Sequence, residues 1–109
     1  MRTKDFMVLV EKRFEHCRKL LGGSKDLEYS RNGDKLWNFK AAAAITRQTS
    51  EKALLGMWTK HLVSVLDIID DLDNNIIPTQ ETINEKVGDN INYLLLLEGL
   101  IKERRMDEC

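Results

Sequence analysis

Three acidic residues recur at four-residue intervals in the stretch ETINEKVGDNINYLLLLEGLIKER. They are Glu81, Glu85 and Asp89. On a helix that turns by about 100° per residue, they fall with Asn92 within about 80° of arc. Carboxylate oxygens are the ligands that Mg²⁺ or Mn²⁺ prefers, and a bound cation would also relieve the repulsion between the three acids. The spacing is therefore compatible with a divalent metal site on one helix face.

A second interpretation is open, because charged residues on a helix are often only a solvated face. The residues that follow favour the metal. Leu96 continues the stripe, and most other residues from 93 to 100 are leucine. A helix that is apolar on all sides is buried, so we expect the stripe to run toward the interior. Gly88 lowers helix stability by about 1 kcal/mol relative to alanine, which favours close approach of another helix or a ligand there.

An earlier segment carries a second polar stripe, with Lys60, Ser64, Asp67 and Asp71. Lys60 would contact a phosphate, and Asp67 would complete the metal site. Alternatively, the acids from 67 to 73 are a solvated helix end. Acids near a helix C-terminus oppose the helix dipole, which favours a cation nearby.

The segment EYSRNGDKLWNF, residues 28–39, mixes aromatic rings with cations and amides. Aromatic rings stack on nucleobases, and cations bind phosphate. The candidate nucleotide-binding residues here are Tyr29, Arg31, Lys35, Trp37 and Asn38. In the alternative interpretation Trp37 and Phe39 belong to the core, since a small fold seldom exposes so many large rings.

Helical periodicity predicts four helices that position these residues, at about 3–21, 35–47, 50–72 and 80–105. Gly22 and Gly23 end the first helix. The expected N-caps of the other three are Asp34, Thr49 or Ser50, and Thr79. Because the links are short and no strand pattern is present, we expect an all-α four-helix bundle that forms one domain, residues 1–109.

Apolar residues at helical spacing predict the faces that form the core. On the first helix they are Phe6, Val10, Phe14, Cys17 and Leu21; on the third, Leu55, Trp58, Leu62, Val65, Ile69 and Leu72; on the fourth, opposite the acidic stripe, Ile83, Val87, Ile91, Leu94 and Ile101.

Composition narrows the classes of partner. The net charge is −1, with 17 basic and 18 acidic residues. That balance argues against broad binding to nucleic acid or to anionic membranes. No apolar run is long enough to span a bilayer, and the N-terminal run is too short for a signal peptide. Two cysteines indicate neither a disulfide scaffold nor a zinc site, so a reducing cytoplasm is expected. Oligomerisation would stabilise so small a domain.

Three blocks of the chain resemble a widespread family of small all-α phage and prophage proteins. They are EYSRNGDKLWNFKAAA, ALLGMWTKHLVSVLDIIDD and ETINEKVGDNINYLLLLEGLIKER. The last block is also similar to the final motif of MazG-like nucleotide pyrophosphatases and of phage nucleotide-modification-associated proteins. The resemblance implies Glu85 and Asp89 as Mg²⁺ ligands and Asn92 as a polar contact. The Glu-x-x-Glu pattern of that superfamily is absent from the earlier helix, where KHLVSVLDIIDD stands instead.

Two functions follow from these residues and this resemblance. The first is a homo-oligomeric, Mg²⁺-dependent nucleoside triphosphate pyrophosphohydrolase. Its metal ligands would be Glu81, Glu85, Asp89 and Asp67, and its catalytic residues Glu85, Asp89 and Lys60. The second is a non-catalytic phage protein in the host cell cytoplasm, which sequesters a nucleotide signal or inhibits a host defence protein.

Overall fold

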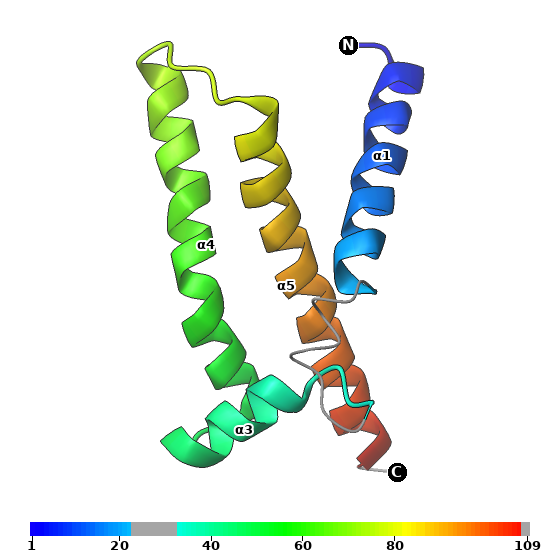
Figure 1. The fold of residues 1–109 in the computed structure, drawn as a ribbon, viewed down its shortest axis with the longest axis vertical. Coiled ribbons are helices and arrows are strands. Elements are labelled where there is room, and N and C mark those ends of the chain that lie inside the picture. Colours follow the sequence, from blue (N-terminus) through cyan, green and yellow to red (C-terminus); the bar gives the residue numbers. More distant parts are fainter. Residues whose placement is uncertain (23–32, 108–109) are drawn as a thin grey trace.

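The computed structural model describes residues 1–22 and 33–107 of the 109-residue chain. Within these ranges the chain forms four helices and no strand: α1 (Thr3–Leu21), α3 (Trp37–Thr46), α4 (Ser50–Asp73) and α5 (Gln80–Asp107) (Figure 1). The predicted all-α class is therefore confirmed for the described part of the chain. The helix bounds agree with the predicted ones to within two residues.

Side-chain caps explain where two of the helices begin. The backbone N–H of Lys52 donates to Thr49 Oγ1 at 3.1 Å, and that of Thr82 donates to Thr79 Oγ1 at 3.1 Å. Both caps satisfy donors that have no partner inside the helix. The prediction for Asp34 is wrong in position. Its Oδ1 accepts from the N–H of Leu36 at 2.9 Å, two residues on, and so closes a turn that precedes α3.

α5 is the central helix of the fold. α4 packs along one side of α5 and runs antiparallel to it. α1 packs along the other side of α5, and α3 crosses below and packs on α4 (Figure 1). At the end of α1, Gly22 N–H donates to Arg18 O at 3.0 Å with a φ of −103°. This glycine therefore ends the helix without the left-handed conformation that its residue type predicts.

The main core lies where α3, α4 and α5 meet. Leu36, Phe39, Leu54 and Leu100 are buried there, and Met57, Trp58, Tyr93, Leu96 and Leu97 pack against them. Cys17 is fully buried between α1 and α5, apart from this cluster. The C-terminal half of α5 is thus partly enclosed, as its leucine-rich sequence predicts.

Large parts of the predicted core faces are nevertheless exposed. Phe6 and Phe14 on α1 are each 51% exposed, and Leu94 on α5 is 52% exposed. The same holds for Leu55, Leu62, Ile69 and Leu72 on α4 and for Val87 and Ile101 on α5. Their predicted burial within one chain is wrong, because α5 is the only neighbour along most of α4 and α1 in the described structure.

Candidate functional site

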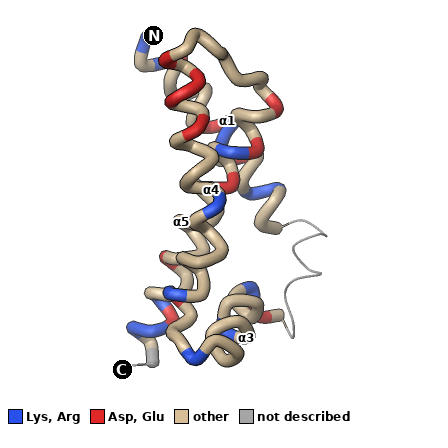
Figure 2. The backbone as a smooth tube through the Cα atoms, turned by 90° about the vertical axis from the view of Figure 1, so that its left-hand side faces the viewer, with Lys and Arg blue, Asp and Glu red and all other residues tan. Residues whose placement is uncertain are grey.

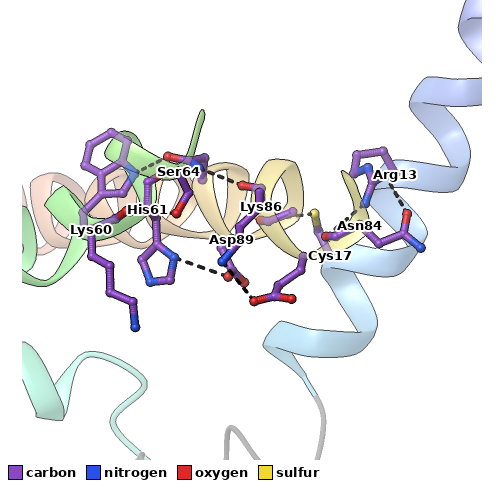
Figure 3. A network of polar contacts seen from close by, with 12 residues as sticks. Arg13, Cys17, Lys60, His61, Ser64, Asn84, Lys86 and Asp89 are labelled. Carbon is purple, nitrogen blue, oxygen red and sulfur yellow. Dashed lines mark hydrogen bonds and ion pairs between the residues drawn. The ribbon is translucent and has the colours of Figure 1, made fainter. Parts of the chain in front are cut away.

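The two long helices meet through a histidine and a carboxylate. His61 Nδ1 of α4 lies 3.4 Å from Asp89 Oδ2 of α5, with side chains 19% and 29% exposed (Figure 3). This contact is an ion-pair contact without a hydrogen bond, since the buried Nδ1 has no hydrogen-bond partner. The two groups therefore attract each other chiefly when the imidazole is protonated.

One amide fixes the position of α4 against α5. Trp58 Nε1 donates to Asn90 Oδ1 at 2.8 Å. Asn90 Nδ2 donates in turn to His61 O at 3.0 Å and to Lys86 O at 2.7 Å. Because these bonds join both helices within one turn of Asp89, they hold His61 and Asp89 in register.

Aromatic rings surround the same place. The ring of Tyr93 lies 5.1 Å from that of His61, 6.3 Å from that of Trp58 and 6.4 Å from that of Phe39. Burial, and secondly the negative charge of Asp89, raise the pKa of Tyr93. Its hydroxyl group therefore stays protonated at neutral pH and keeps its ability to donate a hydrogen bond.

Lys60 is exposed on α4 and extends to the same side as His61 and Asp89 (Figure 3). Lys60, His61, Asp89 and Tyr93 together are named the α4/α5 polar site. Asn38 is exposed near the start of α3, and its Nδ2 lies 4.0 Å from the sulfur of Met57, one turn before His61 on α4.

The predicted metal ligands do not come together within the chain. Glu81, Glu85 and Asp67 are exposed, and only Asp89 reaches the opposite helix. Glu85 Oε1 lies 3.1 Å from Lys86 Nζ. Across residues 1–22 and 33–107, no three His, Cys, Asp or Glu side chains are grouped to hold a metal ion. The acids at 67, 70, 71 and 73 are all exposed, as a solvated helix end would be.

The predicted nucleotide-binding residues are dispersed. Tyr29 and Arg31 lie outside the described residues. Lys35 Nζ donates to Leu21 O at the end of α1, and Trp37 is half-buried at the start of α3. Among the described residues of this set, Asn38 contacts α4 through Met57.

Asn92 is a buried polar residue of α5. It is only 9% exposed, and its Oδ1 is buried without a hydrogen-bond partner. Gly88, one turn before Asn92 on α5, faces α1, so Asn92 lies toward α1, whereas Asp89 contacts α4.

α1 is attached to α5 on the side away from α4. Arg13 Nη2 donates to Asn84 Oδ1 at 2.9 Å, and Cys17 Sγ lies 4.0 Å from Gly88 O. The close approach predicted at Gly88 is therefore confirmed, and the approaching helix is α1. A Cβ at Gly88 would meet Arg13 and His16 side chains at 3.6 Å. Burial raises the pKa of the Cys17 thiol.

Sequence reasoning missed the two amides that join the helices, Asn84 and Asn90. Asparagine is a poor helix former. Its presence inside a long helix, at positions between the acidic and apolar stripes, is the signal that points to such contacts.

Comparison of the chain with protein-family models, with curated proteins and with solved structures finds no match. The resemblance to phage and MazG-like proteins thus stays a prediction. No helix within the described ranges has the length and hydropathy required to cross a bilayer.

Proposed function

We propose that the protein binds a nucleoside triphosphate together with its Mg²⁺ at the α4/α5 polar site. The supporting observation is that Lys60 and His61 of α4 and Asp89 of α5 gather on one side of the helix pair. A cation, a titratable imidazole and a carboxylate beside aromatic rings match the parts of such a ligand, namely phosphates, metal ion and base.

Mg²⁺ does not require a complete cage of protein ligands. It keeps several waters and is commonly held by one or two carboxylates plus the phosphates of its substrate. Asp89, with Glu85 one turn earlier on the same helix, supplies two carboxylates for an ion that arrives with the nucleotide. The absence of a three-residue cluster within the described ranges is compatible with this mode of binding.

Each side chain of the site then has a distinct task. Lys60 Nζ neutralises phosphate charge. Asp89 orients the imidazole through their 3.4 Å contact, and the protonated Tyr93 hydroxyl adds a donor. Asn38 offers an amide for the edge of the base.

Hydrolysis is the catalytic form of the proposal. A neutral His61, oriented by Asp89, would accept the proton of a water that attacks the α-phosphorus. The bond from that phosphorus to the bridging oxygen breaks, and Mg²⁺-pyrophosphate leaves with the nucleoside monophosphate as the second product.

Non-catalytic nucleotide binding is the second candidate. It is favoured because no three metal-binding side chains are grouped within the described ranges, and because the Glu-x-x-Glu pattern is absent from α4. In this form the protein would sequester the nucleotide and release no pyrophosphate.

Calorimetric titration tests the proposal, using ribo- and deoxynucleoside triphosphates with Mg²⁺. We expect at least one to bind with a Kd below about 100 μM. Asp89→Asn and Lys60→Gln should each weaken binding about tenfold or more, whereas Glu11→Gln, an exposed acid on α1, should not. Failure of the folded wild-type protein to bind any nucleotide contradicts the proposal. Release of pyrophosphate separates the catalytic from the non-catalytic form.

A further inference from the structure

The chain exposes much more surface than a compact monomer of its size. Its accessible area is 8499 Å², whereas a folded 12.6 kDa monomer exposes about 6,200 Å². The excess, 8499 minus about 6,200, is about 2,300 Å². Its radius of gyration is 16.2 Å against about 13 Å expected for this length. Obligate dimers bury about 1,000–2,500 Å² on each chain, so the excess is of the size that one such interface covers.

Two apolar stripes form part of this surface. We name them together the apolar face: the exposed Leu55, Leu62, Leu66 and Ile69 of α4, and on α5 the exposed Val87, Leu94 and Ile101 with the half-buried Ile83 and Ile91. Leu66 is 60% and Leu94 is 52% exposed, although each recurs at core-type helical spacing. Contiguous exposed apolar surface of this extent marks an interaction site.

Helix geometry places both stripes on the same side of the α4–α5 pair. At about 100° per residue, the α4 stripe is centred about 110° from His61 and the α5 stripe about 150° from Asp89. Because His61 and Asp89 meet on one side, the stripes share the other side. The apolar face is therefore opposite the α4/α5 polar site, and covering it leaves that site open.

A groove extends the apolar face to α1. It has a volume of about 980 Å³, and Val8 and Leu9 of α1 line it with Ile83, Val87 and Ile91 of α5. Polar side chains also line it, among them Lys12 and His16. A mixture of apolar and polar side chains is usual at a protein interface.

Charge is distributed unequally along the long axis of the molecule. Acidic positions predominate at the end where α4 turns into α5, and basic positions gather toward the C-terminus (Figure 2). On α4, Lys52 and Asp70 are both exposed. They are 18 residues apart, which is five full turns or about 27 Å, so they border the stripe on the same edge at opposite ends.

We infer that the apolar face is covered by a second copy of the same chain, packed antiparallel in a two-fold dimer. A two-fold axis near Leu62 places Leu55 against Ile69 of the second copy. It also brings Lys52 of each chain near Asp70 of the other, so opposite charges meet twice. A symmetric dimer needs a self-complementary surface of this kind. This inference is independent of the proposed nucleotide binding, which uses the other side of the helix pair.

Sedimentation velocity tests the dimer, with the full-length chain at micromolar concentration. The wild type should have a mass of about 25 kDa, twice 12.6 kDa. Leu66→Glu should shift the protein to monomer while retaining its helical circular dichroism, because Leu66 contacts little within one chain. Ile45→Glu, on α3 and 82% exposed, should remain dimeric. A monomeric wild type overturns the inference, as does a Leu66→Glu protein that still self-associates.

Charge reversal tests the antiparallel orientation, and it decides the question if Leu66→Glu fails to fold. Lys52→Asp and Asp70→Lys should each weaken the dimer about tenfold, since each introduces two like-charge contacts. The double variant should regain wild-type affinity. No rescue in the double variant contradicts the antiparallel arrangement. If the wild-type protein forms the dimer but binds no nucleotide, the proposed function is contradicted and the dimer is not.

Discussion

Asp89 lies 3.4 Å from His61 across the α4–α5 interface, while Glu85, one turn earlier on the same stripe, is exposed. The regular spacing of the acids gives them one helix face, but contact with α4 distinguishes Asp89 from the others. This contact, with exposed Lys60 beside it, defines the proposed nucleotide site.

Asn90 should contribute more to stability than its polar side chain suggests. Asn90→Ala leaves the N–H of Trp58 without its acceptor, and we expect the free energy of unfolding to fall by about 1–3 kcal/mol. Urea denaturation of Asn90→Ala, Trp58→Phe and the double variant measures this. The double variant should lose less than the sum of the single losses, because both remove the same bond. Strict additivity would show that the bond does not hold the helices together.

Gly56 offers a gain in stability. It lies inside α4, and a Cβ added there meets nothing within 4 Å. Gly56→Ala should raise the free energy of unfolding by about 0.5–1 kcal/mol, since alanine is the better helix former. Gly33→Ala is the contrasting variant and should be destabilising, because Gly33 has a φ of +73°. A destabilised Gly56→Ala protein would reveal a contact on the outer side of α4.

Acid should weaken the junction between α4 and α5. Arg104 donates to both carboxylate oxygens of Glu51, at 2.8 and 2.7 Å, and these bonds lower the pKa of Glu51. A lowered pKa adds stability above the unfolded pKa of about 4.3, and that stability is lost as the pH falls through the folded pKa. Arg104→Gln should lose less than about 1 kcal/mol at pH 7 and show a shallower decline between pH 5 and 3. Parallel pH profiles for the two proteins would contradict this assignment.

Cys17 reports on the docking of α1. Its thiol is buried against Gly88, and burial raises its pKa, so both access and ionisation are reduced. In a Cys109→Ser background, we expect the native thiol to react with a disulfide reagent at least about 100-fold more slowly than in urea. Asn84→Ala removes the acceptor of Arg13 and should speed the native reaction. Equal native and unfolded rates would show that α1 is not held on α5.

The helices themselves could be predicted from local chemistry. Thr49 and Thr79 precede helices and supply caps, and Pro78 and the glycines near 22 separate apolar-periodic segments. These signals act over three or four residues, so they do not depend on how the helices pack. Asp34 shows the limit, because its side chain closes a turn before α3 instead of capping the helix.

The pairing of side chains between helices could not be predicted in the same way. A helical wheel gives the angle of Asp89 on its own helix but not the rotation of α4 that brings His61 to it. Contacts such as those of Asn90 and Asn84 set this rotation, and each joins residues far apart in sequence. The stripe therefore divides, with Asp89 facing α4 and Asn92 on the side toward α1.

The prediction of core residues was limited for a different reason. Leu55, Leu62 and Ile69 have core-type spacing, yet they are exposed in the single chain. Sequence periodicity shows that a face is to be buried and does not show whether the covering surface belongs to the same chain. The proposed dimer accounts for these residues.

Paramagnetic broadening by Mn²⁺ tests the nucleotide proposal most directly, because it locates the metal. Amide signals of the protein are recorded by NMR with nucleotide and substoichiometric Mn²⁺, and again with Mn²⁺ alone. In the wild type, we expect the signals of Lys60, His61 and Asp89 to be lost when nucleotide is present with Mn²⁺. In Asp89→Asn, we expect the signals at these positions to remain under the same conditions. Broadening confined to the exposed acids from 70 to 73, or unchanged by nucleotide, would contradict the proposed site.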